Sequence, residues 1–255
     1  MIEAKHVSKW FNGQQILFDI SAVFETGKTN LIIGQSGSGK TVFMKCLIGL
    51  FVPDEGEVLY DGRKFRSLNE SQKRQLRSEI GMLFQGSALF DNETVMGNVM
   101  FPLKMFSKMT RHEQIERAQF CIDRVGLKNA NDKFPSEISG GMQKRVAIAR
   151  AIALNPRYLF CDEPNSGLDP QTSILIDQLL SDITHEYGIT TIINTHDMNS
   201  VLGIGENIVF INKGHCDWTG NDHTIYRSDN KDLNNFVFAS HLFKEVKQYL
   251  EKKYD

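Results

Sequence analysis

The spacing of apolar residues changes along the chain and predicts which segments form strands and which form helices. In residues 18–24 nearly every second position is apolar, and a Gly-containing turn follows at 25–27. This period of two predicts an antiparallel strand. The short apolar run 31–33 predicts a further strand, which leads directly into the glycine-rich segment 34–41.

Helical spacing begins immediately after that segment. Apolar residues recur three or four positions apart between 42 and 50, and a Pro- and Gly-containing segment follows at 53–56. The pattern predicts a helix that the segment 53–56 stops. The residues expected to face the core are Val42, Phe43, Cys46, Leu47 and Leu50.

Further helix starts are marked by capping residues. Segments 67–70 and 110–113 each begin with Ser or Thr and end with Glu, the pattern of a capping box. Asp169 followed by Pro170 predicts an N-cap and a first-turn proline. We expect a helical insertion over about 93–137 in a strand-rich core. Its second helix should bury Ile115, Ala118, Ile122 and Val125.

The glycine-rich segment fits the pattern G-x-x-x-x-G-K-[ST]. In this motif small residues let backbone N–H groups surround a polyphosphate at a helix N-terminus. Lys40 then serves the phosphates and Thr41 serves Mg²⁺. The sequence therefore predicts a nucleotide site formed by Gly34, Gln35, Ser36, Gly37, Ser38, Gly39, Lys40, Thr41 and Val42.

A second anion-binding helix start follows later in the chain. Ser139, Gly140 and Gly141 form a turn that opens a predicted helix, where free amides and the positive end of the dipole attract an anion. One nucleotide would not normally need both motifs from one subunit. A head-to-tail pair of identical chains would use both motifs twice under two-fold symmetry.

Polar residues stand at the ends of several apolar runs. The run 158–161 ends in Asp162 and Glu163, which places both acids at the carboxyl end of a buried strand, where ligands of open α/β sheets bind. Because neighbouring strand residues point opposite ways, we expect Asp162 to hold Mg²⁺ and Glu163 to poise a water molecule. Gln85 and His196 follow two other runs.

Taken in their order along the chain, these elements resemble the nucleotide-binding subunit of an ABC transporter, over residues 2 to about 220. The resemblance implies an α/β fold with a P-loop NTPase core, an antiparallel β subdomain and an inserted helical subdomain. The ATPase domain would span 1–239. It also assigns Asp169 to the nucleotide site and Phe11 to the adenine, with Trp10 as a rival for that contact.

The same resemblance implies Mg²⁺-dependent ATP hydrolysis at an interface shared by a homodimer. Ser139 and Gly141 would close each site from the partner chain, and His196 would support the γ-phosphate. The expected catalytic residues are Glu163, His196, Lys40 and Gln85. The expected ligands of Mg²⁺ are Thr41, Gln85 and Asp162.

Composition limits the partners. The 255 residues have a formal net charge of −2, which predicts no nucleic-acid partner. The chain also has no apolar run of the roughly 18 residues that a membrane span requires. The pore would be another chain. We therefore expect a peripheral subunit on the cytoplasmic face of the inner membrane, bound to integral-membrane permease subunits and without direct contact to the cargo.

Small departures from the family pattern indicate the cargo. Position 142 is Met where most of these ATPases carry Gln. Together with segment 84–91, this departure resembles the ATPases of the MCE (mammalian cell entry) phospholipid transporters, which implies an MCE-type lipid-binding partner. The alternative is an importer of amino acids or other small polar solutes. A soluble ATPase acting on DNA or ribosomes is disfavoured, because the chain has one cassette, no long heptad insertion and no basic arm.

Two segments leave alternatives open. Methionine and phenylalanine are concentrated in 82–109 and indicate either interior packing of the insertion or an adaptable groove for a helix of the membrane subunit. In the second case Phe90, Met100 and Phe101 would line the groove. The tail 240–255 has helical spacing and predicts an amphipathic helix, packed on its own core, exposed at the chain end, or docked on the partner ATPase or the membrane.

Overall fold

The computed structural model describes residues 1–240, 243–245 and 247, which form two compact units. The first unit consists of Met1–Ser67 and Asn194–Asp255, and the second of Leu68–Ile193. Strand β8 (Thr190–Thr195) begins in the second unit and ends in the first. Most of the tail helix predicted for 240–255 lies outside the described residues.

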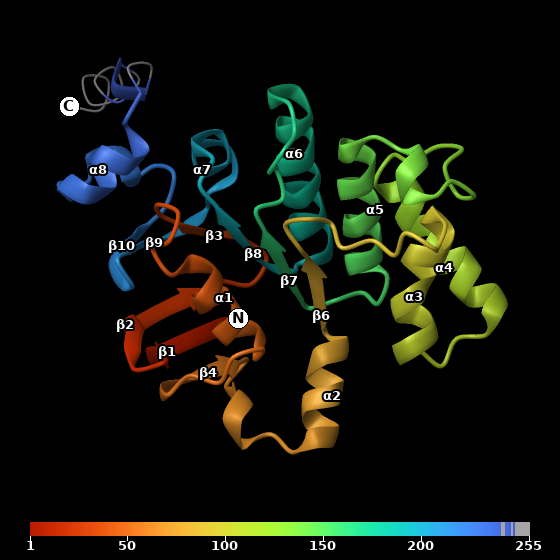
Figure 1. The fold of residues 1–255 in the computed structure, drawn as a ribbon, viewed down its shortest axis with the longest axis horizontal. Helices are drawn as coiled ribbons and strands as arrows, with labels where there is room; N and C mark the ends of the chain where they lie inside the picture. Colours follow the sequence, from red (N-terminus) through yellow and green to blue (C-terminus); the bar gives the residue numbers. More distant parts are fainter. Residues whose placement is uncertain (241–242, 246, 248–255) are drawn as a thin grey trace. The chain divides into compact units, whose positions relative to one another are not determined.

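An antiparallel sheet in the first unit confirms the strand predicted at 18–24. Its strand order is β2-β1-β4-β5, and Figure 1 shows β2, β1 and β4 side by side. Ile2 lies opposite both Phe24 and Tyr60. These three side chains are fully buried and form part of the core. The strands are β1 (Ile2–Phe11), β2 (Gln14–Phe24), β4 (Glu55–Tyr60) and β5 (Arg63–Lys64).

A second set of strands in the first unit carries the glycine-rich loop. Strand β3 (Thr29–Ile33) pairs in parallel with β9 (Asn207–Asn212), which pairs antiparallel with β10 (His215–Gly220). Every residue of β3 is buried, as the apolar run predicted. The remaining elements are α1 (Lys40–Ile48), η1 (Phe65–Ser67), α7 (Met198–Ile204), η3 (Ile225–Arg227) and α8 (Lys231–Val237).

Helix α1 ends earlier than predicted. Gly49 adopts φ 79° after Ile48, and its N–H donates to the carbonyls of the last turn. A glycine in this left-handed conformation is a common helix terminator. The stop predicted at 53–56 is therefore wrong, and Leu50, predicted to be in the core, is 58% exposed because it lies beyond the cap.

The second unit contains parallel strands, which confirms the α/β fold class. Its strand order is β8-β7-β6, and Ile80 of β6 (Ile80–Leu83) lies opposite Tyr158 of β7 (Tyr158–Asp162). The flanking helices in the chain are α2 (Glu70–Ser78) and α6 (Pro170–Tyr187). Asp169 is the N-cap of α6 and Pro170 its first residue, as predicted.

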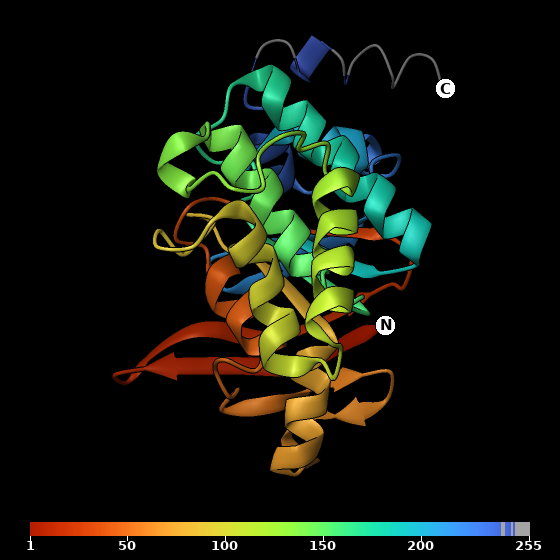
Figure 2. The same cartoon turned by 90° about the vertical axis from the view of Figure 1, so that its right-hand side faces the viewer.

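Three helices of the second unit pack side by side: α3 (Val95–Phe106), α4 (Arg111–Arg124) and α5 (Gly140–Ile152), with the short η2 (Pro135–Glu137) before α5 (Figure 2). Among the described residues no helix is both long enough and apolar enough to cross a membrane.

The capping boxes had opposite outcomes. The box at Thr110 is confirmed, because the Thr110 N–H donates to Glu113 and the Glu113 N–H donates to Thr110 Oγ1. The box at 67–70 is wrong, because Asn69 caps α2 together with Gln72 instead. Ile115 is 41% exposed, contrary to its predicted core position, whereas the other predicted core residues of α4 are buried.

Candidate nucleotide site

The glycine-rich loop is packed so closely that its first position requires glycine. A Cβ atom at Gly34 would lie 2.1 Å from the Ile211 carbonyl oxygen of β9 and 2.8 Å from Ser38 Oγ. Gly34 also has φ 148°, and Gly39 has φ 104°. Glycine adopts such angles without the penalty that a side chain imposes. Glycine at positions 34 and 39 therefore permits the path that the loop follows in the structure.

The loop gathers several groups that could bind a polyphosphate. Lys40 is buried, and its Nζ donates to the carbonyl oxygens of Gly34 (2.8 Å) and Gln35 (2.9 Å), which holds the cation across the loop. The N-cap of α1 has no side-chain hydrogen bond, and its first turn contains no acid. Ser38 Oγ is buried and has no hydrogen-bond partner among the described residues. These groups match the donors that phosphate oxygens need.

The remaining predicted residues of the loop also lie in the first unit and differ in their exposure. Gln35, Ser36 and Gly37 are exposed at its tip, while Val42 is half-buried in α1.

Thr41, the predicted metal ligand, is contacted by a residue that sequence reasoning did not assign. Asn194 is fully buried at the end of β8, and its Nδ2 donates to Thr41 Oγ1 (3.3 Å). The only feature of the sequence that could have pointed to Asn194 is that it is the one amide side chain in the run 190–194. His196 is exposed, two residues further on in the same unit.

Phe11 offers its ring to a ligand more readily than Trp10 does. Phe11 ends β1 and is exposed, whereas Trp10 is half-buried. The Phe11 ring meets Phe51 edge to face, with 5.2 Å between centroids, and Lys9 Nζ lies 5.3 Å from its centroid. Phe51 therefore supports the ring that the family resemblance assigns to adenine.

In the second unit the predicted catalytic acid and glutamine meet. Asp162 is the last residue of β7, and Glu163 follows it with φ 47°. Glu163 itself therefore has a left-handed backbone conformation. Its side chain does not follow the simple strand alternation with Asp162 that the sequence predicted. Gln85 Nε2 donates to Glu163 Oε2 (2.9 Å). The structure thus places Gln85 directly on the proposed base.

Lys144 is a further buried cation of this cluster that the sequence did not reveal. It lies on α5, and its Nζ donates to the Gln85 carbonyl oxygen. Burial lowers the pKa of Lys144, and the nearby negative groups, including Glu163 and Asp162, oppose that shift. The lysine therefore partly offsets the negative charge of the two acids.

The second anion-binding helix start has the predicted form. Ser139 is the N-cap of α5, its Oγ accepts from the Met142 N–H (3.3 Å), and the first turn contains no acid. A Cβ atom at Gly141 would lie 2.8 Å from Thr172 Cγ2, so glycine is needed at this contact with α6. Gly140 has no such close contact.

Asp169 is linked to this helix start by Thr172, which it hydrogen-bonds and which lies next to Gly141. Asp169 accepts from the Thr172 N–H (3.0 Å) and from Thr172 Oγ1 (2.6 Å), and these hydrogen bonds hold the pKa of Asp169 below its usual range. Asp169 is therefore a carboxylate at neutral pH.

Each unit thus gathers its own share of the predicted residues. The first holds Phe11, the loop 34–41, Val42 and His196; the second holds Gln85, Ser139, Gly140, Gly141, Asp162, Glu163 and Asp169. Among the described residues no group of three or more His, Cys, Asp or Glu side chains could hold a metal ion. The predicted ligands Thr41, Gln85 and Asp162 would supply oxygen atoms and a single carboxylate. Mg²⁺ prefers oxygen ligands and is usually bound by one or two carboxylates together with nucleotide phosphates.

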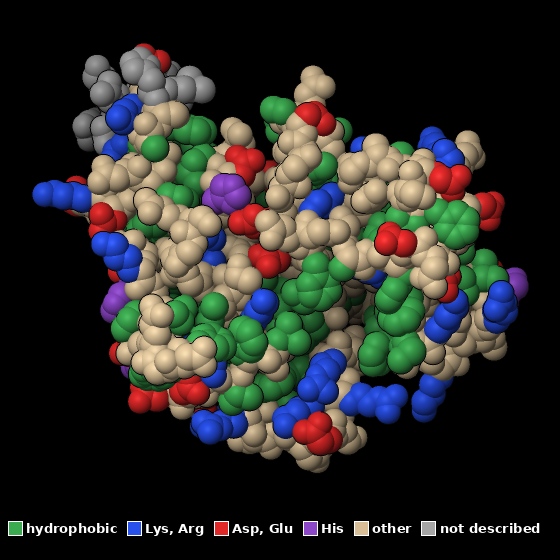
Figure 3. Space-filling view, in the orientation of Figure 1, with side chains coloured by type: hydrophobic (Ala, Val, Ile, Leu, Met, Phe, Trp, Pro, Cys, Tyr) green, Lys and Arg blue, Asp and Glu red, His purple; other side chains and the backbone are tan. Residues whose placement is uncertain are grey.

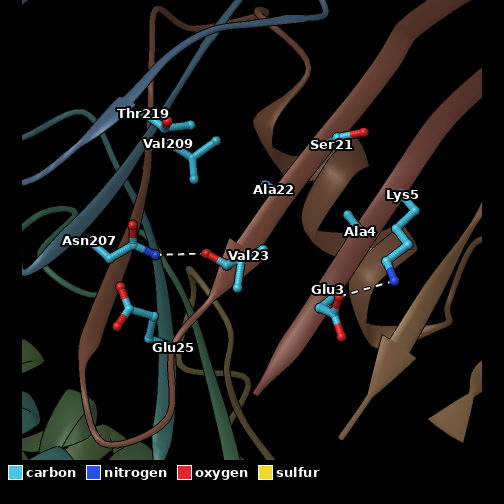
Figure 4. A pocket seen from close by; sticks show the side chains of 10 residues that line it. All are labelled: Glu3, Ala4, Lys5, Ser21, Ala22, Val23, Glu25, Asn207, Val209 and Thr219. Carbon is cyan, nitrogen blue, oxygen red and sulfur yellow. Dashed lines mark hydrogen bonds and ion pairs between the residues drawn. The ribbon is translucent and has the colours of Figure 1, made fainter. Parts of the chain in front are cut away.

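A separate open pocket of about 510 Å³ lies in the first unit (Figure 4). Asn207 Nδ2 crosses part of it to donate to the Val23 carbonyl oxygen (2.8 Å), and Lys5 pairs with Glu3. None of the predicted site residues lines this pocket.

Comparison with known proteins identifies the family. Residues 17–166 match the family described as ABC transporter. The methionine import ATP-binding protein MetN of Clostridioides difficile is 39% identical over 93% of this chain and 74% of its own length. A probable ribonucleotide transport ATP-binding protein of Mycobacterium leprae is 35% identical over 92% of this chain and 68% of its own.

A solved ATP-binding cassette has the same fold. It is a dimer in a post-hydrolysis state bound to ADP and Pi, is 33% identical, and superimposes with a TM-score of 0.79 over 87% of this chain and 99% of its own. The chain therefore belongs to the ABC transporter family and is an ATP-binding, ATP-hydrolysing subunit.

Proposed function

We propose that this ATPase powers the import of an amino acid or another small polar solute through a separate membrane subunit. The observation that carries this proposal is the 39% identity with a methionine import ATP-binding protein over 93% of the chain. Phospholipid transport is the second candidate. It is favoured by Met142 and the segment 84–91, whereas the related proteins named above are described as methionine and ribonucleotide transport proteins.

In the proposed mechanism the first unit binds the nucleotide. Lys40 and the loop amides hold the β- and γ-phosphates, while Phe11 contacts the adenine. Thr41 would hold Mg²⁺, which neutralises phosphate charge when bound. The hydrogen bond from Asn194 restricts the rotation of the Thr41 hydroxyl, so this ligand is oriented in advance.

The second unit supplies the chemistry in this proposal. Asp162 and Gln85 would complete the ligands of Mg²⁺, and Glu163 would accept a proton from the attacking water. The Gln85 amide that donates to Glu163 fixes the carboxylate orientation. His196 supports the γ-phosphate.

We further propose a homodimer in which Ser139, Gly140, Gly141 and Asp169 face the partner's nucleotide. The N-termini of α1 and α5 support this arrangement, because the first turn of each helix contains no acid that would repel a phosphate. The solved dimeric cassette with ADP and Pi supports it independently. Under two-fold symmetry each interface would combine one loop 34–41 with one α5 N-terminus.

An exposed aromatic surface on the second unit fits a membrane partner, which would place the chain peripherally at the cytoplasmic face of the inner membrane. Phe90 is 38% exposed and Phe101 39%, and their ring centroids lie 4.5 Å apart. Figure 3 shows hydrophobic side chains gathered over the part of the second unit that carries α3. Met100 is only 5% exposed, so its predicted place in the groove is wrong; it packs in the interior.

Replacing Phe101 by Asp should abolish co-purification of the chain with its membrane subunits while ATP binding persists, because a buried carboxylate in an apolar interface lacks a partner. The matched control is Phe120→Asp on α4, where the aromatic ring is 47% exposed. Co-purification should be unchanged in this control. Equal loss in both variants, or no loss in Phe101→Asp, would contradict the proposed docking surface.

The cargo class is tested on the intact complex. We expect mass spectrometry of the complex purified from native membranes to find an amino acid or a similar polar solute, and we expect that molecule to raise the rate of ATP hydrolysis. Bound phospholipid with no response to polar solutes would favour the second candidate instead.

A further inference from the structure

The backbone that follows Gln85 has an uncommon shape. Ser87 has φ 62° and Ala88 has φ 47°, so two successive residues with side chains are left-handed. The Ser87 N–H donates to the Phe84 carbonyl oxygen (2.9 Å). Residues other than glycine occupy this region at an energetic cost, and they stay there only where surrounding contacts hold them.

Helix α5 supplies those contacts through two long cationic side chains. Lys144 Nζ donates to the Gln85 carbonyl oxygen. Arg150 Nη2 donates to the Ser87 carbonyl oxygen (2.7 Å), and its Nη1 donates to that of Ala88 (2.7 Å). Charge-assisted hydrogen bonds are stronger than neutral ones, and a guanidinium can hold two acceptors in a fixed geometry.

The side chain of Gln85 carries this constraint to the proposed base. Its Nε2 donates to Glu163 Oε2 (2.9 Å), while its backbone carbonyl accepts from Lys144. A shift of the 85–88 backbone would therefore move the amide that orients Glu163. Lys144 is buried and Arg150 is half-buried, so neither side chain can rearrange freely.

We propose that Lys144 and Arg150 are positioning residues for ATP hydrolysis. They clamp three backbone carbonyls, those of Gln85, Ser87 and Ala88, to α5 and thereby set the place of the Gln85 side chain against Glu163. The same helix begins at Ser139, so the clamp ties the N-terminus offered to the partner to the base within its own chain. The inference rests on the proposed catalytic role of Glu163.

The chain offers a matched control for a purely structural role. Arg117 on α4 also donates to backbone carbonyls of the α5 region, from Nε to Ala153 (2.9 Å) and from Nη2 to Ile152 (2.9 Å). These carbonyls lie at the C-terminal end of α5, away from Gln85 in the chain. Loss of Arg117 removes the same kind of hydrogen bond without touching 85–88.

The test compares Arg150→Met, Arg150→Lys and Arg117→Met in the full chain. For Arg150→Met we expect kcat to fall about ten- to a hundredfold, since small misplacements of catalytic groups have effects of this order. KM for ATP should stay within about threefold, because the phosphate loop is unchanged. Backbone amides of 84–88 should exchange hydrogen faster. Arg150→Lys should recover part of kcat, and Arg117→Met should keep kcat within about twofold.

A wild-type kcat in folded Arg150→Met, or an equal loss of kcat in Arg117→Met, would overturn the proposal. If Arg150→Met does not fold, Lys144→Met and Lys144→Arg decide. The proposal requires a fall in kcat for Lys144→Met and recovery for Lys144→Arg; equal rates in both overturn it. Glu163→Gln is measured alongside. Normal turnover there would remove the catalytic role of Glu163, whereas unchanged hydrogen exchange at 84–88 in Arg150→Met would remove the clamp itself.

Discussion

Replacing Glu163 by Gln is expected to lower ATP turnover by about 10²–10⁴-fold, the usual contribution of a general base. The amide keeps the shape of the side chain but cannot accept a proton from water. Nucleotide binding should persist, because the loop around Lys40 lies in the other unit and is unchanged. The measurements are kcat at saturating ATP with Mg²⁺ and the amount of ATP retained by the protein, which should rise as ATP-bound dimers accumulate.

A carboxylate outside the site provides the control. Glu116 on α4 is exposed, and its carboxylate lies within ion-pair distance of His112 on the same helix. Glu116→Gln should therefore turn over ATP at the wild-type rate. If Glu163→Gln retained near-normal turnover, Glu163 would have no place in the mechanism.

The second large effect concerns which chain supplies Ser139. In a Glu163→Gln background that retains ATP, one chain carries Lys40→Ala and the other carries Ser139→Arg. Neither variant should trap ATP as its own homodimer. In the mixed dimer one interface combines the intact loop of the Ser139→Arg chain with the intact Ser139 of the Lys40→Ala chain. We therefore expect one trapped ATP per mixed dimer, measured with labelled nucleotide after gel filtration.

Folding of the Ser139 variant has to be checked first. Ser139 Oγ accepts from the Met142 N–H, and loss of such an N-cap costs about 1 kcal/mol of stability. The melting temperatures of both homodimers are compared with that of the parent. If the site were completed within one subunit, neither chain would have an intact pair, and the absence of trapped ATP in well-folded mixed dimers would refute the shared site.

Local chemistry made parts of the fold predictable from sequence. Gly34 and Gly39 occupy positions where φ or close packing demands glycine, so the motif and the loop geometry coincide. Thr110 and Asp169 cap their helices because the side-chain oxygen of each accepts from the backbone amide three residues later.

The failures arose where neighbouring signals competed. Leu50 continued an apolar pattern, but Gly49 had already ended the helix. Asn69 replaced Ser67 as the cap of α2, because it pairs reciprocally with Gln72. Periodicity alone could not decide between these neighbouring starts and stops.

The sequence predicted which residues belong to the candidate site, but it did not predict which other side chains hold them in place. Lys144 and Arg150 appear in the sequence as ordinary cations of a helix, and only the fold brings them to the carbonyls of 85–88. Asn194 differs from its apolar neighbours, but its partner Thr41 is distant in the chain. The cargo was not predictable on the same basis, because in the proposed function no residue of this chain contacts it.

The left-handed backbone of Glu163 means that the residue proposed for ATP hydrolysis also lowers the stability of the fold at this position. A residue with a side chain at φ 47° loses roughly 1–3 kcal/mol relative to an unstrained conformation. Glycine at position 163 would relieve that strain and remove the proposed base. A variant with glycine at this position would therefore gain stability and lose turnover, because the conformation that strains the glutamate is one that glycine adopts freely.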